Sequence, residues 1–277
     1  PFEEKIDIPY DTNFIINSLS AKVLGNSIAL TPDSKLNLYV TFTYDLYKYL
    51  PIYIFIRKAN NKFKKRFGLM FHYFRYKKVQ KFILDLVESK GIVLMDNDTL
   101  RTTKEIFELS FKGKVIPLIT DSYKLKIIKR NTKAESLNVF WIGRLADFKA
   151  KTVCSIAKSI SYCKNKDSIT YHIVGDGAEE NYTRKYIDGL SIKVKYWGHQ
   201  DYNDLDSILL KEADILIGHG LSILKGARLG IPSIVANGLY TKIEPNEFKV
   251  NWIHNMKDYE VGSVSYSSNE LTGVNLS

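Results

Sequence analysis

The sequence predicts an α/β fold that is divided into two domains, residues 1–135 and residues 136–277. From residue 136 onward, apolar segments alternate with segments of helical character, which is typical of a parallel sheet with helical crossovers. The first four of these apolar segments each run into a glycine. The net charge of +10 lies wholly in residues 1–135, with 24 basic and 14 acidic residues, whereas residues 136–277 hold 16 of each. This asymmetry indicates two units with different partners.

The second domain has the clearer pattern. Strands are expected at residues 139–142, 170–174, 194–197, 215–217 and 232–236. Helices are expected at residues 150–164, 203–211 and 222–229, and another helix follows the second strand and its glycine turn and ends at about residue 187. In parallel α/β sheets, ligands bind beyond the carboxyl ends of the strands, where glycine lets a ligand approach the backbone. The glycines that end the first four strands therefore predict the binding edge: Gly143, Gly175, Gly198 and Gly218.

The first domain is expected to be incomplete, because the chain starts at Pro1 and not at a methionine. Weak strands are expected at residues 14–16 and 36–42, stronger ones at 91–96 and 114–118, and a helix at 102–110. Residues 46–84 contain no acidic residue and should be largely helical.

Eleven Lys and Arg residues, interleaved with Tyr and Phe, occupy residues 48–81. Two interpretations stay open: a patch that binds an anionic membrane surface, or a solvated basic face above core aromatics. Nucleic acid is not expected as a partner, because no nucleic-acid-binding motif accompanies the charge. No apolar run reaches the ~18 residues of a membrane-spanning helix.

Cys154 and Cys163 lie nine residues apart on one expected helix, and neither belongs to a metal-binding spacing. Two free thiols in a reducing compartment are expected. The expected location is therefore cytoplasmic, with peripheral attachment at the inner face of the cytoplasmic membrane if the basic patch binds lipid.

A first motif, Gly143-Arg144-Leu145-Ala146-Asp147-Phe148-Lys149, joins a strand to a helix. Arg144 and Lys149 can both face one anion there, and the helix N-terminus adds free N–H groups and its dipole. A diphosphate suits this site, since Arg144 can bind two oxygens and Lys149 acts as a point charge. The alternative is two solvated basic side chains in a loop.

Two further glycine turns follow along the chain. Val174-Gly175-Asp176-Gly177 is either part of the site or a tight turn with Asp176 as helix N-cap. The turn Gly218-His219-Gly220-Leu221-Ser222 opens a helix and can cradle a phosphate or a sugar with backbone N–H groups. The alternative there is a plain glycine turn with Ser222 as N-cap.

Three patterns occur in order over residues 136–236: G-R-L-x-x-x-K, I-V-G-D-G, and W-G followed by A-D-I-L-I-G-x-G-x-S-x-L-x-G-A-x-x-G-I-P. Together they resemble the donor-binding half of GT-B glycosyltransferases, in particular the retaining, group 1-type family that builds bacterial surface polysaccharides. The resemblance implies two Rossmann-like domains that face a cleft, with the acceptor side in residues 1–135. It also implies transfer from a nucleotide diphosphate sugar to a saccharide or lipid-linked saccharide, without metal or cofactor.

The resemblance also assigns residues to the donor. Arg144 and Lys149 match the pair that holds the donor diphosphate. The backbone after Gly198, including His199, lies near the base, and the loop of residues 218–222 lies near the phosphates and sugar. Gly175, Asp176 and Gly177 of the second glycine turn are also expected to be donor-binding residues.

The sequence departs from the family at two positions. The family carries two glutamates eight residues apart, and these fall on Ile217 and Lys225. The second glutamate binds the nucleotide ribose, and an ammonium group cannot accept the hydroxyl hydrogens. Either the donor is held differently, with Lys225 as an altered ligand, or the chain is a degenerate, non-catalytic GT-B subunit that binds a nucleotide or a partner.

Asp96-Asn97-Asp98 follows an apolar strand and is similar to the metal-binding Asp-x-Asp of GT-A glycosyltransferases. Because the later patterns favour GT-B, Asp96 is expected at the cleft as a catalytic candidate, with a helix-capping role as the alternative. His219 is the second catalytic candidate, although a plain loop role is open for it and for His199. His172 is expected in the core.

Overall fold

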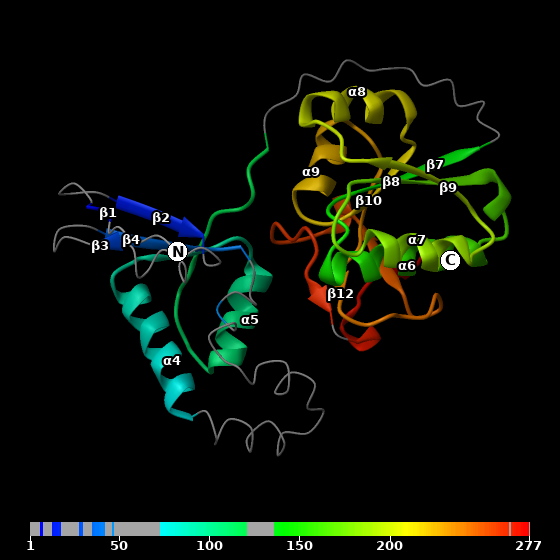
Figure 1. The fold of residues 1–277 in the computed structure, drawn as a ribbon. Helices are drawn as coiled ribbons and strands as arrows, with labels where there is room; N and C mark the ends of the chain where they lie inside the picture. Colours follow the sequence, from blue (N-terminus) through cyan, green and yellow to red (C-terminus); the bar gives the residue numbers. More distant parts are fainter. Residues whose placement is uncertain are drawn as a thin grey trace. The chain divides into compact units, whose positions relative to one another are not determined.

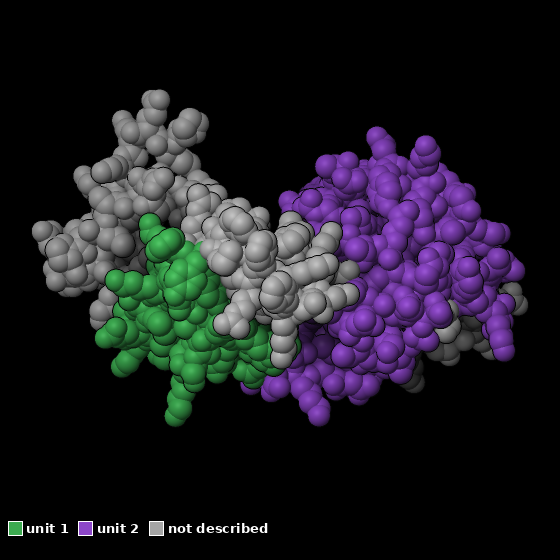
Figure 2. All heavy atoms as spheres, turned by 90° about the horizontal axis from the view of Figure 1, so that it is seen from below, with its two compact units in different colours: residues 1–117 green, residues 118–277 purple. Residues whose placement is uncertain are grey.

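The computed structural model describes residues 6–7, 13–17, 28–29, 35–41, 46, 73–120, 136–265 and 267–276. The chain divides into two compact units, Pro1–Pro117 and Leu118–Ser277 (Figure 2). Both units combine mainly parallel sheets with helices, which confirms the predicted α/β class. Residues 121–135, which precede the expected domain boundary, lie outside the described residues.

The second unit is built on one sheet with the strand order β15-β13-β11-β10-β7-β8-β9. Its parallel strands are β7 (Leu137–Ile142), β8 (Ile169–Val174), β9 (Lys193–Gly198), β10 (Ile215–Gly218) and β11 (Ser233–Val235). The chain runs outward from β7 to β9 and then returns to β10 on the other side of β7. The strand order therefore reverses between β7 and β10, and ligands bind at such a switch point in this kind of sheet.

Four helices cover the two faces of this sheet. Figure 1 shows α6 (Asp147–Tyr162) and α7 (Glu180–Asp188) on one face, and α8 (Tyr202–Glu212) and α9 (Leu221–Arg228) on the other. Each strand and helix expected between residues 139 and 236 is present. Alternate residues of the strands face opposite layers, so that the buried Trp141 packs in the α6 layer while Leu216 closely approaches Gly226 of α9.

Smaller elements complete the second unit. Two antiparallel strands, β13 (Lys249–Trp252) and β15 (Val274–Asn275), extend the sheet beyond β11. A separate pair is formed by β12 (Gly238–Leu239) and β14 (Val264–Ser265). Short 3-10 helices lie at Lys166–Ser168, Ile253–Asn255 and Ser268–Glu270. Cys154 and Cys163 are free thiols.

The first unit has a parallel sheet of order β2-β4-β5-β6. Its strands are β2 (Asn13–Asn17), β4 (Lys35–Val40), β5 (Ile92–Leu94) and β6 (Lys114–Val115), beside a separate pair of β1 (Ile6–Asp7) and β3 (Ile28–Ala29). The helices α4 (Tyr73–Glu88) and α5 (Asn97–Phe107) pack on β5, and their core includes Ile83, Leu94 and Phe107. The expected strands are confirmed, and so is a helix over the last part of the basic stretch. Residues 47–72 lie outside the described residues.

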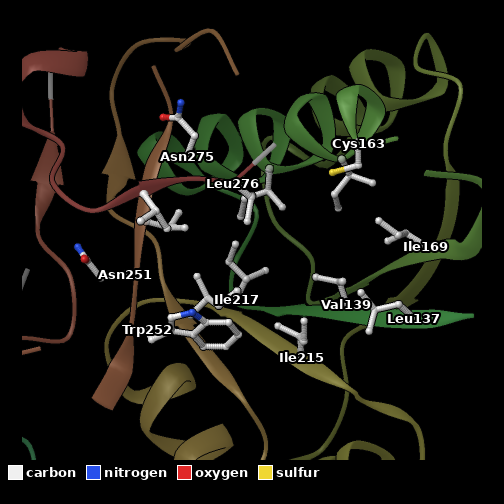
Figure 3. Close-up of a pocket in the computed structure, with 15 residues that line it drawn as sticks. Leu137, Val139, Cys163, Ile169, Ile215, Ile217, Asn251, Trp252, Asn275 and Leu276 are labelled. Carbon is white, nitrogen blue, oxygen red and sulfur yellow. The ribbon is translucent and has the colours of Figure 1, made fainter. Parts of the chain in front are cut away.

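An apolar pocket of about 300 Å³ opens in the second unit, at the amino ends of the parallel strands (Figure 3). Leu137, Ile169 and Ile215, the first residues of their strands, line it together with Cys163. Its wall offers few polar groups, so it is distinct in place and in chemistry from the glycine edge of the same sheet. Among the described residues, no helix has the length and apolar character needed to cross a membrane.

Candidate functional site

The predicted binding edge is present. Gly143, Gly175, Gly198 and Gly218 all stand at the carboxyl ends of parallel neighbouring strands. The Gly143 N–H donates to the Val174 carbonyl at 3.0 Å, and the Gly175 N–H donates to the Gly198 carbonyl at 2.8 Å. Backbone hydrogen bonds thus join these strand ends into one edge of the sheet. This edge includes the switch point between β7 and β10.

The first two glycine turns are also bonded to each other. The Leu145 N–H donates to the Asp176 carbonyl at 2.7 Å, and the Glu179 N–H donates to the Leu145 carbonyl at 2.9 Å. Gly175 has a φ of 128°, and a Cβ there would clash with the Gly143 carbonyl oxygen. This glycine is therefore required by the close approach of two backbones. The side chain of Asp176 is exposed and does not cap α7, whose N-cap is Glu179, so the alternative of a capping role for Asp176 is wrong.

Arg144 and Lys149 carry the positive charge of this edge. Arg144 is exposed in the turn after β7, and Lys149 is half-buried in the first turn of α6. Burial, and then the charge of Arg144, lower the pKa of Lys149, which places the two cations within each other's field. The Lys149 side chain has no hydrogen bond or ion pair to any residue that the structure describes. Ala146 gives the start of α6 no side-chain cap, so its N–H groups add to the attraction for an anion.

Two buried aromatic rings lie beside this charge. Trp141 is 1% exposed and His219 is 9% exposed, and their rings meet edge to face with centroids 5.6 Å apart. Within the described part of the chain, Trp141 Nε1 makes no hydrogen bond. Burial, and then the charge of Lys149, lower the pKa of His219 to about 3, and a hydrogen bond with the Ala236 backbone raises it by a smaller amount. His219 is therefore a neutral, enclosed side chain and not an exposed loop residue.

The third glycine turn leads into α9. Gly220, with a φ of 64°, is the N-cap residue, and its N–H donates to the Val261 carbonyl at 2.8 Å. Ser222 is the second helical residue, and its hydroxyl donates to the His219 carbonyl at 2.8 Å. The alternative that Ser222 is the N-cap of this helix is therefore wrong. Leu221 is exposed at the start of α9 and offers only its backbone as a polar group.

Lys225 lies one helical turn into α9 and is only 7% exposed. Its ammonium group pairs with one carboxylate oxygen of Asp206 on α8, and Arg228 pairs with the other. The same ammonium lies 3.6 Å from the centre of the Tyr202 ring. Ile217, at the other family glutamate position, is fully buried in β10. Sequence reasoning missed Asp206, because only the packing of α8 on α9 brings it to Lys225.

Asp96, His199 and His172 are the other candidates that the sequence names. Asp96 belongs to the other unit and caps α5, where its carboxylate accepts from the Thr99 N–H at 2.7 Å and burial raises its pKa. Asp98 pairs with Arg101, so both carboxylates of the Asp-x-Asp are engaged by protein groups. His199 is exposed after Gly198. His172 is a core residue as expected: its ring accepts from Trp197 Nε1 and bonds to Asn138, each at 3.0 Å.

No protein-family model and no curated protein matches the chain. Among solved structures, TarM of S. aureus (a mutant in complex with Fondaparinux, alpha-GlcNAc-glycerol and UDP) is similar at a TM-score of 0.52 and 15% identity, over 92% of this chain and 46% of that chain. The catalytic domain of the cholesterol-alpha-glucosyltransferase from Helicobacter pylori has 22% identity over 37% of this chain and 65% of that chain, at a TM-score of 0.33. HepE of Anabaena, in complex with UDP and glucose, has 13% identity over 90% of this chain and 68% of that chain, at a TM-score of 0.43.

The likeness to TarM shows that the fold is of the GT-B glycosyltransferase type, as the sequence predicts. The chain spans about half of the TarM chain and just under two thirds of the Helicobacter pylori domain.

Proposed function

We propose that the chain is the donor-binding part, with some of the acceptor side, of a glycosyltransferase that uses a nucleotide diphosphate sugar. The observation that carries this proposal is the cationic edge at the switch point of a GT-B-type sheet. Arg144, Lys149 and the uncapped start of α6 converge there, beside backbone turns that glycine keeps open. TarM, which shares the fold, was solved with UDP, and this supports a nucleoside diphosphate as the natural anion.

In this proposal the protein acts by positioning and by charge. Arg144 binds two oxygens of the diphosphate, and Lys149 neutralises the charge that builds up on it as the sugar departs. Neutralisation by side chains and a helix end leaves no step that requires a metal ion. The acceptor is a saccharide or lipid-linked saccharide hydroxyl, and retention of the anomeric configuration follows the family that the motifs resemble. Asp96 stays a catalytic candidate from the first unit.

The first unit offers a surface that suits a lipid-linked acceptor. On α4, Lys77, Lys78 and Lys81 share an exposed face with Phe74, which is 88% exposed, and with the half-exposed Phe82. The opposite face of the helix is buried in the core. Cations beside protruding aromatic rings are the chemistry of an anionic membrane interface. We include peripheral attachment through this face in the proposed function.

The test begins with binding. Uridine, guanosine, adenosine and thymidine diphosphates and their sugar conjugates would be screened by thermal shift, and a ligand at about 100 times its Kd stabilises by about 2.7 kcal/mol. We expect one nucleoside diphosphate series to raise Tm, and expect its nucleoside not to. No stabilisation by any of them would overturn the proposal.

Turnover separates the enzyme from the degenerate subunit. A radiolabelled form of the sugar nucleotide that binds best would be incubated with membrane extracts as acceptor, with and without a chelator. Transfer that persists with the chelator supports a metal-independent enzyme. Tight binding without transfer or hydrolysis supports the non-catalytic alternative, which the replacement of both family glutamates would explain.

A further inference from the structure

The apolar pocket of the second unit lies at the amino ends of the parallel strands, at the opposite edge from the glycine turns (Figure 3). The proposed function makes no use of it. Its volume of about 300 Å³ is at the lower end of the range of small-molecule sites. The lining includes Val139 and Ile217 of the strands and Ile156 and Ile160 of α6, all of which are buried. The pocket therefore enters the core and is not a flat apolar face.

The shape of the pocket is long and narrow. Its lining crosses six neighbouring strands, from β8 through β7, β10, β11 and β13 to β15, with α6 opposite them. Since neighbouring strands lie about 4.8 Å apart, six strands extend over about 24 Å. A CH2 group fills about as much space as a water molecule, ~30 Å³, so about ten such groups in a row fill the pocket. An extended chain suits this shape better than a compact ring system does.

The wall of the pocket offers almost nothing to a polar ligand. None of the lining residues that the structure describes is charged. The Cys163 thiol already donates to the Ser159 carbonyl at 3.6 Å, and the Asn251 amide donates to the Thr272 carbonyl at 3.0 Å. Figure 3 shows Asn251 and Asn275 at one end, away from the aliphatic side chains around the centre. A polar group in the centre would lose its water without gaining a partner, so the part of a ligand that lies there must be hydrocarbon.

We propose that this pocket binds one hydrocarbon chain of a lipid, about ten carbons long, and leaves the head group of that lipid in the solvent. The half-buried Trp252 forms part of the wall, so its ring would lie against the chain. The proposal does not depend on the nucleotide site, and a failure to bind nucleotides would leave it untouched.

The first experiment titrates the whole chain with neutral alkyl glucosides, from hexyl to tetradecyl, below the concentration at which each forms micelles. We expect affinity to rise about fourfold with each added CH2 group, which corresponds to about 0.8 kcal/mol. The rise should stop at about ten carbons, where the pocket is full. A rise that continues to the longest chain would show adsorption to the outer surface, and no binding would exclude a lipid chain. Either result overturns the proposal.

Two signals locate the bound chain. A decyl glucoside with bromine at the end of its chain should quench the fluorescence of Trp252, and Trp252→Phe should remove the quenched part, since Trp141 and Trp197 do not line the pocket. Saturating decyl glucoside should also slow the alkylation of the half-buried Cys163 by iodoacetamide. Unchanged Trp252 fluorescence and an unchanged rate at Cys163 would place the ligand elsewhere and overturn the site.

A matched pair of variants tests the lining. Ile169→Trp narrows the pocket at the first residue of β8, and we expect it to weaken decyl glucoside about 16-fold, the worth of two CH2 groups. Ile192→Trp is the control, because this half-buried isoleucine just before β9 does not line the pocket. Equal affinity of both variants would contradict the site. If Ile169→Trp does not fold, the protection of Cys163 in the wild type still decides the matter.

Decanoate separates two sources of such a chain. Binding of decanoate well above that of decyl glucoside supports the site and indicates a free fatty acid. Binding of the glucoside that equals or exceeds that of decanoate supports the site and indicates a lipid with an uncharged or saccharide head. Failure of both ligands to bind overturns the proposal.

Discussion

Lys225 on α9 is paired with Asp206 on α8, deep between the two helices. Arg228 holds the second oxygen of the same carboxylate, and the Tyr202 ring covers the ammonium group. The side chain at the position of a family glutamate is therefore part of a helix-to-helix ion cluster. This arrangement gives Lys225 a structural role. It therefore changes the effect that we expect from replacing Lys225 by the family's glutamate.

Lys225→Glu should destabilise the second unit, because it sets a carboxylate against Asp206 in a buried place. Breaking a buried ion pair costs about 3–5 kcal/mol, and the partial exposure of Asp206 favours the lower end. Urea unfolding would measure the loss. The double variant Lys225→Glu with Asp206→Lys restores opposite charges at these two positions but sets a lysine beside Arg228, so it should recover only part of the loss. Unchanged stability together with altered nucleotide affinity would instead place Lys225 at the donor.

Arg144→Ala and Lys149→Ala should each weaken binding of a nucleoside diphosphate about 10- to 150-fold, the worth of a charged hydrogen bond of roughly 1.5–3 kcal/mol. Nucleoside binding should barely change. Lys164→Ala is the matched control, because this exposed lysine lies just past the opposite end of α6. Calorimetric Kd values decide the matter, and equal affinity of all three variants and the wild type would remove the cationic pair from the site.

Diphosphate affinity should fall as the pH rises, and the fall should begin below the usual range of lysine. Burial and the charge of Arg144 lower the pKa of Lys149, so that its proton is lost earlier than from an ordinary lysine. Only the protonated form attracts the anion. Lys149→Arg keeps its charge over this range, and its affinity should be flat with pH. The same slope in both proteins would mean that the ligand, and not Lys149, titrates.

Gly175→Ala should damage the fold more than Gly198→Ala does. Both residues have positive φ, 128° and 63°, but an added Cβ clashes with the Gly143 backbone at the first and meets open space at the second. The left-handed conformation alone costs about 1–2 kcal/mol, which is the loss expected for Gly198→Ala. Thermal unfolding of both variants tests the ranking. Equal losses would show that the turn at Gly175 can move aside.

Binding to vesicles that contain phosphatidylglycerol should depend on the basic face of α4. Replacing Lys77, Lys78 and Lys81 by Gln should weaken it by about 3 kcal/mol, roughly a hundredfold, since each cation near such a surface contributes about 1 kcal/mol. Phe74→Ala should weaken it at unchanged charge. The charge-matched control replaces three exposed lysines of the second unit: Lys185, Lys193 and Lys211. Equal weakening by both triple variants would contradict a defined membrane face.

The glycine edge was predictable because it depends on order along the chain. Apolar strands that alternate with helices make a parallel sheet, and the residue after each strand then falls at one edge. The Lys225–Asp206 pair was not predictable in this way, since the two residues meet only through the packing of α8 on α9. The unpaired indole N–H of Trp141 was not predictable for another reason. A tryptophan inside an apolar strand indicates a core residue, and only the three-dimensional structure shows whether its N–H has a partner.

Two capping alternatives for residues in the glycine turns were wrong. Asp176 and Ser222 both have side chains that cap helices well, but the helices begin beyond Asp176 and before Ser222. The capping alternative for Asp96 is present: Asp96 lies in the short turn between β5 and α5, and its carboxylate accepts from the Thr99 N–H.

The bonds that tie the turn at residues 143–145 to the turn at 175–179 run between main-chain atoms alone. The position of Arg144 is thus set by carbonyl and amide groups that every amino acid supplies, together with glycines that no other residue can replace without strain. Drift in the intervening side chains, Asp176 included, leaves the placement of the cation intact. Such a site can diverge until its sequence no longer matches its relatives while its geometry is inherited unchanged.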